Sequence, residues 1–159
     1  MDELIADLDR QFSQLNQEWR AVLDAVEPGL LYRRPLRGLH SSTSQSGGEL
    51  ILRSAAAVEQ TFGGLATNLW DDPFEWTLPE TLSTTEKIAA YLSEVEATRR
   101  RGFELFNSDD DLSKEIMAPA GVTQLEPLLL DTLRRARHYL ESAQSTCELV
   151  RAEENQTKH

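Results

Sequence analysis

The segment from Gln124 to Ala152 constrains the fold more than any other part of the chain. Thr123 and Glu126 have the S/T-x-x-E spacing of a capping box, which predicts that a helix starts here. After Pro127, which a first helical turn tolerates, neither Gly nor Pro occurs for about seven turns. Small or apolar residues recur there at spacings of three and four: Leu129, Thr132, Ala136, Leu140, Ala143, Cys147 and Val150. A helix with such a stripe is not stable alone in water, so the chain must contain partners for it.

Three further segments have the same periodicity and provide those partners. They cover about residues 2–26, 47–69 and 83–107, with Asp2 and the pair Ser83 and Glu86 as expected caps. The first of them has a predicted apolar face of Leu4, Leu8, Phe12, Leu15, Trp19, Val22 and Val26. No strand pattern or internal repeat appears, so the sequence predicts an all-α protein, a four-helix bundle over residues 1–152 with a disordered tail over residues 153–159.

The connections between these helices are of two kinds. Residues 27–48 form a long connection that allows a parallel pair of helices. A short irregular or 3₁₀ segment in it is expected to pack over the end of the bundle through Leu30, Leu31, Tyr32, Leu36 and Leu39. The connection after residue 69 contains Trp70, Phe74 and Trp76, which either plug the end of the bundle or form the wall of a ligand cleft. Residues 112–122 are expected to cross irregularly to the last helix.

Composition narrows the class of partner. The chain has 159 residues, which fits one domain, and a net charge of −11 at pH 7, which disfavours binding to nucleic acid. Cys147 is the only cysteine, and its place on the apolar stripe predicts a buried, inert thiol. No apolar run approaches the ~20 residues of a membrane span, and the acidic N-terminus does not resemble a secretory signal. We therefore expect no membrane partner and a cytoplasmic location.

The segment from Arg134 to Glu141 reads Arg-Arg-Ala-Arg-His-Tyr-Leu-Glu. It resembles the last-helix segment H-x-x-x-H-x-G-Q of the DinB/YfiT-like superfamily, a metalloenzyme superfamily of four-helix bundles with up-down-down-up helix order. His138 matches the second histidine, whereas Arg134 replaces the first and Leu-Glu replaces Gly-Gln. The resemblance extends to the segment 46–51, Ser-Gly-Gly-Glu-Leu-Ile, which is similar to the S-x-G-E-x-L opening of the superfamily's second helix.

This resemblance implies a metal site that the chain only partly retains. A catalytic zinc or nickel ion needs about three protein ligands and an open position. The positions implied for them hold Arg53 or Ser54, Arg134 and His138. Arginine stays protonated and repels a dication, so His138 is the only surviving ligand candidate and we expect no metal cofactor.

The two arginines suggest a different ligand. Planar guanidinium groups at Arg53 and Arg134 suit a carboxylate or phosphate, and an acidic partner is needed to offset their mutual repulsion. The candidates closest by helical spacing are Glu49, Asp131 and Glu141. Periodicity alone places Arg53 and His138 on solvated faces, whereas the resemblance directs them into a cleft, and we favour the cleft.

These observations lead to one functional prediction and two alternatives. The chain is predicted to be a metal-free member of the superfamily that binds a small, anionic ligand or a protein partner through Arg53, Arg134, His138, Glu49 and Asp131. The first alternative is a zinc- or nickel-dependent thiol transferase or isomerase, as the superfamily's active members are, and the second is a purely structural oligomer. The habit of the superfamily also suggests a homodimer.

Overall fold

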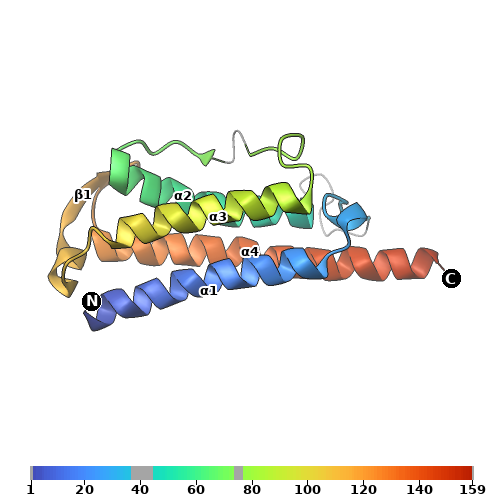
Figure 1. Cartoon of the computed structure of the whole chain (residues 1–159), viewed down its shortest axis with the longest axis horizontal. Coiled ribbons are helices and arrows are strands. Elements are labelled where there is room, and N and C mark those ends of the chain that lie inside the picture. The colour runs from blue at the N-terminus through green and yellow to red at the C-terminus, as the bar shows by residue number, and fades with distance from the viewer. Residues whose placement is uncertain (1, 37–44, 74–76, 159) are drawn as a thin grey trace.

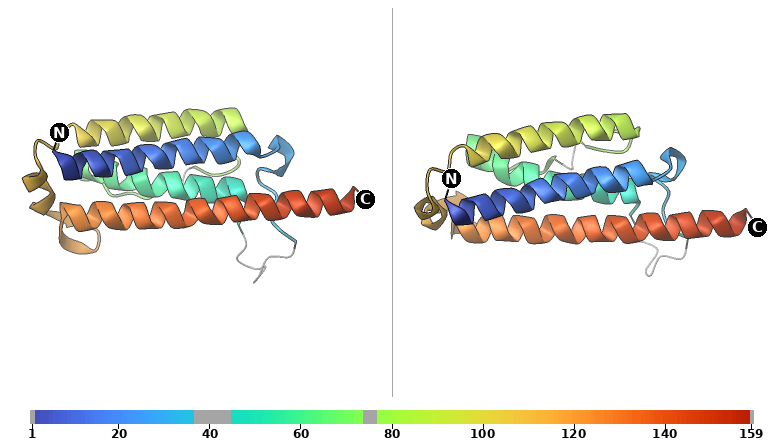
Figure 2. Two further views of the ribbon diagram at one scale, coloured as in Figure 1. Left: turned by 90° about the horizontal axis from the view of Figure 1, so that it is seen from below. Right: turned by 60° about the horizontal axis from the view of Figure 1, so that its bottom comes forward.

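The structure is a computed structural model that describes residues 2–36, 45–73 and 77–158. Most of the described chain is helical, which confirms the predicted all-α character. Four long helices lie side by side (Figures 1 and 2): α1 (Glu3–Ala25), α2 (Gly47–Thr67), α3 (Thr85–Phe103) and α4 (Leu125–Thr157). The shorter elements are η1 (Pro28–Leu30), η4 (Asp109–Ser113), β1 (Glu115–Ala118) and β2 (Gly121–Gln124). No helix of the described chain has the length and apolar character needed to cross a lipid bilayer.

The four helices run in two directions. In Figure 1, α1 and α4 run from left to right, whereas α2 and α3 run from right to left. α2 packs against α4 and α3, and α1 packs against the same two helices. The connection over residues 27–48, which the sequence allows to join a parallel pair, joins α1 to the oppositely directed α2. The parallel helices α2 and α3 are instead joined by residues 68–84, which return the chain to the end where α2 began.

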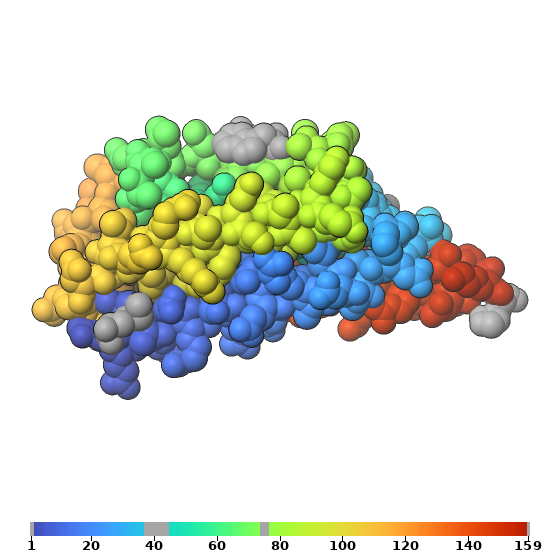
Figure 3. Space-filling view, in the orientation of Figure 1, coloured from blue at the N-terminus to red at the C-terminus, as the bar shows by residue number. Residues whose placement is uncertain are grey.

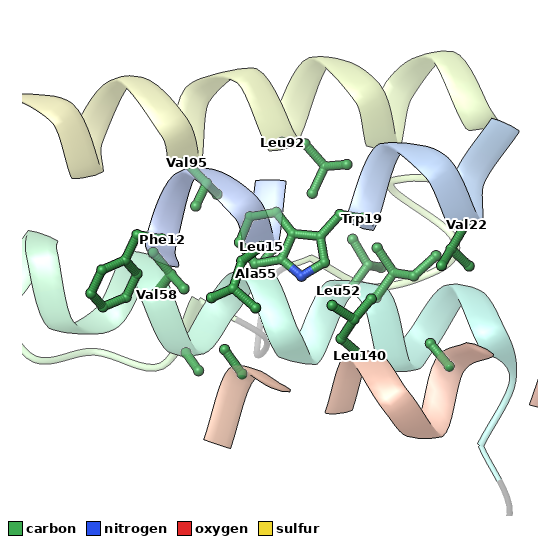
Figure 4. Close-up of a cluster of buried hydrophobic side chains, with 14 of the residues drawn as sticks. Phe12, Leu15, Trp19, Val22, Leu52, Ala55, Val58, Leu92, Val95 and Leu140 are labelled. Carbon is green, nitrogen blue, oxygen red and sulfur yellow. The ribbon is translucent and has the colours of Figure 1, made fainter. Parts of the chain in front are cut away.

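A polar bridge crosses the apolar core at Trp19. Its ring is 1% exposed and lies among apolar side chains of all four helices (Figure 4). The indole Nε1–H donates to Ser54 Oγ over 2.7 Å, and Ser54 Oγ donates to the carbonyl oxygen of Ala136 over 2.6 Å. These two hydrogen bonds connect α1, α2 and α4 and satisfy the buried polar groups, which are costly to leave unpaired.

The apolar stripe predicted for the last helix is confirmed. Every member except Cys147 is buried in α4. Cys147 is half-buried, and its Sγ occupies the space beside Gly47, where the Cβ of any larger residue would come within 2.4 Å of it. Burial raises the pKa of the Cys147 thiol, which agrees with the expected inert state.

Two apolar predictions fail outside the helix centres. Leu4 is 52% exposed, and Ile5, three residues before Leu8 and seven before Phe12, is buried in its place on α1. In the connection after α1, Leu30 and Leu31 are buried as predicted, whereas Leu36 is 81% exposed. Leu39 lies outside the described residues.

Residues 115–124 form a hairpin where an irregular crossing was predicted. β1 and β2 pair antiparallel, with Ala118 opposite Gly121 at the turn. Gly121 has φ +120°, a value that residues with a side chain rarely adopt, so glycine permits the tight return after Pro119. Thr123 is therefore part of β2, and α4 begins after Gln124 with no side-chain cap, so the predicted capping box of Thr123 and Glu126 is wrong.

The other helix ends differ from prediction by a few residues. Thr84, one residue after the predicted cap, accepts from the backbone N–H of Lys87 at the start of α3, which ends at Phe103. α4 continues to Thr157 through the stretch predicted as a disordered tail, and it projects beyond the rest of the molecule (Figure 3). Ala, Glu and Gln are good helix formers, and Glu154 also pairs with Arg33 beside the helix.

Arg99 is a buried charge on the face of α3 that otherwise carries apolar residues, and it is 2% exposed. Its guanidinium pairs with Glu96, one turn earlier in α3, and with Asp9 of α1. Burial opposes the charge, but the hydrogen bonds to Glu96 and Asp9 outweigh it and keep the pKa of Arg99 raised. A charged residue on an apolar stripe is thus explained by its partners on two helices.

We expect Ser54→Ala to destabilise the protein by about 1–3 kcal/mol, because it leaves the indole N–H of Trp19 buried without an acceptor. Urea unfolding followed by circular dichroism measures this loss. The matched control is Ser145→Ala, at an exposed position of α4, the helix whose Ala136 carbonyl accepts from Ser54. It should change the free energy of unfolding by no more than about 0.5 kcal/mol. Equal effects of the two substitutions would contradict a stabilising role for the bridge.

Candidate functional site

The structure separates the arginines that the sequence predicts to converge. Arg134 and His138 are exposed and line a shallow groove between α1 and α4 together with Gln11, Arg137 and Glu141. Arg53 instead lies on α2 beside Arg135, in a different hollow. The predicted cleft shared by Arg53, Arg134 and His138 is therefore not formed, and the favoured inward orientation of His138 is wrong. Periodicity decides the outcome, because Ala136 and Leu140 face the core and direct His138 outward.

The predicted acidic partners are also dispersed. Glu49 forms the capping box of α2 with Ser46, and its Oε1 lies 3.5 Å from Nε of Arg34. Asp131 pairs with both neighbouring arginines of α4, 2.5 Å from Arg134 Nη2 and 3.1 Å from Arg135 Nε. The hydrogen bond from Arg134 and the charges of both arginines lower the pKa of Asp131. Asp131 is thus the one predicted acidic residue that touches the arginines on both sides of α4.

The side chains at the implied metal positions do not fit a metal ion. The Ser54 hydroxyl is already engaged between Trp19 and Ala136, and the arginine alternatives are cations. Across residues 2–36, 45–73 and 77–158, no three or more His, Cys, Asp or Glu side chains are grouped so that they could hold a metal. His40 and His159 lie outside the described residues. The zinc- or nickel-dependent alternative stays a prediction.

A cleft of about 450 Å³ lies between α2, α4 and the hairpin. Much of its wall is apolar or small and comes from the hairpin and the first turns of α4. Its polar side chains come from α2, from α4 and from the segment after α2. The lining comprises Gln60, Thr61, Trp70, Ala118, Pro119, Ala120, Gly121, Val122, Thr123, Pro127, Leu128, Asp131 and Arg135. We call this space the hairpin cleft.

Trp70, which lines the hairpin cleft, contains an unsatisfied donor. Its Nε1 is buried and has no hydrogen-bond partner in the described part of the chain. The residue is held from two sides: Gln60 Nε2 donates to its carbonyl oxygen over 2.9 Å, and its ring lies against Gly64, where a Cβ would come within 2.3 Å. Buried N–H groups without a partner are rare in folded proteins, so this donor needs an explanation.

Thr61, which lines the hairpin cleft, is hydrogen-bonded to Thr132, and the direction of this bond is defined. Thr132 Oγ1 donates to the carbonyl oxygen of Leu128 over 3.0 Å. Its single proton is then used, so the 2.6 Å contact between Thr61 and Thr132 requires Thr61 to be the donor. Thr61 therefore presents only lone pairs to the cleft.

Arg135 stands where the hairpin cleft meets a second, smaller hollow of about 60 Å³. Both are lined by Gln60 and Arg135, and the smaller one also by Arg53, Asp72 and Tyr139. The guanidinium carbon of Arg53 lies 6.0 Å from the centre of the Tyr139 ring, at the outer limit of a cation–π contact. The arginine that accompanies Arg53 is thus Arg135, about 100° around α4 from the predicted Arg134.

The hairpin that walls the cleft is anchored at its base. Leu125 donates its backbone N–H to the carbonyl oxygen of Lys114 over 3.0 Å, which closes the hairpin. Just before it, Asp111 of η4 accepts from Lys114 Nζ at 2.7 Å and from the backbone N–H of Asn107 at 2.7 Å. The bond from Lys114, followed by the backbone bonds of Asn107 and Ser108, lowers the pKa of Asp111 to about 2.

Two residues singled out from the sequence, Trp70 and Asp131, lie in the lining of this cleft, and others were missed. Trp70 lies in the cleft wall, as one of the two interpretations of the aromatic connection expects, while Phe74 and Trp76 lie outside the described residues. Arg135 was missed, although Asp131, Arg135 and Tyr139 are spaced by four and share a helix face. The two strands that complete the wall were missed as well, since four-residue strands give little periodic signal.

Comparison with known proteins does not assign the chain. No model of a protein family matches the sequence, and no curated protein matches it as a relative.

We expect acid to weaken the anchor of the hairpin. Because the pKa of Asp111 is lowered by folding, its stabilisation is present above the ordinary aspartate pKa and is lost as the pH falls from about 4 towards 2. Amide hydrogen exchange of residues 112–124 measures the effect once the rates are divided by the intrinsic rate at each pH, and the resulting protection factors should fall over this range. In Asp111→Asn, the protection factors should already be lower at pH 7 and depend less on pH. An unchanged pH profile of the protection factors in this variant would show that another group is responsible.

Proposed function

We propose that this chain binds a small ligand in the hairpin cleft. The observation that carries the proposal is a cleft of about 450 Å³ whose largely apolar wall also includes Trp70 and Arg135. Small-molecule sites are commonly clefts of this size with apolar walls and a few polar groups. A ligand with an apolar body covers this wall and can offer an acceptor to Arg135.

The chemistry of the lining favours binding over catalysis. The polar side chains of the hairpin cleft are an indole, a guanidinium paired with a carboxylate, an amide and threonine hydroxyls. An indole N–H and a guanidinium are poor general acids and poor general bases. The Gln60 amide already donates to the backbone of Trp70. These groups suit the recognition and orientation of a ligand.

We further propose that the chain is a metal-free, divergent DinB/YfiT-like four-helix bundle with up-down-down-up order. The shared direction of α1 and α4, opposite to α2 and α3, supports this assignment, as does the start of α2 at the segment that resembles the superfamily. In the superfamily's arrangement the metal ligands come from the second and last helices, and the hairpin cleft also lies between α2 and α4. The cytoplasmic location, the homodimer and the absence of a nucleic-acid partner stay predictions.

We expect 4-phenylbutan-1-ol, a neutral probe with one hydroxyl, to bind in the hairpin cleft. A ¹⁵N–¹H NMR titration should show saturable shifts of the Trp70 indole resonance, identified by its absence in Trp70→Phe. Ala120→Trp, which places a bulky side chain at an exposed position of the cleft wall, should weaken binding by about tenfold or more.

The matched control is Met117→Trp, on the same hairpin, 65% exposed and not part of the cleft lining. It should leave the affinity for 4-phenylbutan-1-ol unchanged. The proposal fails if the titration produces no saturable shifts, or if the two tryptophan variants weaken binding equally.

A further inference from the structure

The polar groups of the hairpin cleft differ in whether they can donate or accept hydrogen bonds. Arg135 offers N–H groups that can only donate, whereas Thr61 donates its one proton to Thr132 and can then only accept. An acceptor-rich group of a ligand is attracted by the guanidinium and repelled by the lone pairs of Thr61. The arrangement therefore orients a ligand with its polar end at Arg135.

Arg135 has donors to spare. Within the described chain its one hydrogen bond is from Nε to Asp131, so the two terminal nitrogens are not engaged there. The side chain is 37% exposed, so it is partly shielded from water. A guanidinium presents its terminal N–H groups in a plane, a geometry that matches the two oxygens of a carboxylate.

The charges around this place are balanced. Asp131 pairs with Arg134 and Arg135, and the hydrogen bond from Arg134 and the charges of both arginines lower its pKa. The cleft and the adjacent hollow are lined by two arginines, Arg53 and Arg135, and by two aspartates, Asp72 and Asp131. In a chain with a net charge of −11, a region whose lining has no net negative charge repels an anion less than the average surface does.

The rest of the hairpin cleft is suited to an apolar body. Ala118, Pro119, Val122, Pro127 and Leu128 contribute hydrocarbon surface to the wall. A phosphate or another compact, fully charged ion would leave this surface unused and in contact with water. A ligand with one charged end and a hydrocarbon remainder covers it.

We infer that the ligand of the hairpin cleft is a small monocarboxylate with an apolar body, its carboxylate bound by Arg135 and its hydrocarbon part lying along the hairpin. This inference rests on the proposed function and adds the chemical class of the ligand. Asp131 is a positioning residue: it holds the Nε side of Arg135 and leaves the terminal N–H groups for the carboxylate.

Three probes of one shape test the ligand class: 4-phenylbutyrate, 4-phenylbutan-1-ol and 4-phenylbutylamine. At pH 7 they carry a negative, a neutral and a positive end on the same hydrocarbon body. NMR titration of the full chain should give the highest affinity for 4-phenylbutyrate, about tenfold above the alcohol, and the lowest for the amine.

Two neighbouring substitutions separate the specific contact from general charge. Arg135→Gln should reduce the affinity for 4-phenylbutyrate about tenfold and leave that for the alcohol unchanged. Arg134→Gln also removes one positive charge that pairs with Asp131. Because Arg134 does not line the cleft, this substitution should change the affinity for 4-phenylbutyrate less than about twofold. Circular dichroism establishes that both variants stay folded.

The other outcomes decide separately on the carboxylate assignment and on the proposed binding function. If the alcohol binds in the cleft as tightly as 4-phenylbutyrate, or if Arg134→Gln and Arg135→Gln act equally, the carboxylate assignment is overturned while the binding function stands. If none of the three probes shifts the resonances of the cleft residues, both the assignment and the proposed function are overturned.

Discussion

The hydrogen-bonded bridge from Trp19 through Ser54 to Ala136 fixes the relative position of three helices. Apolar contacts alone tolerate small rotations and shifts, but a donor and an acceptor 2.7 Å and 2.6 Å apart in a dry core do not. With α1, α2 and α4 held in this way, the outer faces of α2 and α4 are fixed as well. The hairpin cleft lies on those faces, so its geometry depends on a contact that is not part of it.

The same bridge explains why the metal chemistry implied by the resemblance does not fit here. One of the two residues implied for the α2 ligand is Ser54, and its hydroxyl is fully occupied inside the core next to an indole ring. α4 is oriented so that Ala136 faces the core and the histidine at position 138 points outward. A position that resembles a ligand position in sequence therefore lies in a different chemical environment in the folded chain.

The helices could be predicted from the sequence, and the parts between them could not. The α4 stripe from Leu129 to Val150 repeats over many turns, which is enough for its period to be recognised in the sequence. The hairpin has two four-residue strands, too short for a period to appear, and depends on one glycine with positive φ. Arg134 and Arg135 are adjacent residues of the same type. Packing sets the rotation of α4 about its axis, and this rotation decides which of the two lies near Arg53.

The hairpin places much of the cleft wall outside the core. Met117 and Val122, which are paired across the two strands, are 65% and 61% exposed, and Val122 also lines the cleft. Substitutions in this short ribbon alter the shape of the cleft while the helix stripes and the Trp19 bridge are untouched. The shape of the cleft and the stability of the helical core therefore depend on largely separate stretches of the chain, and related sequences can diverge in one without change in the other.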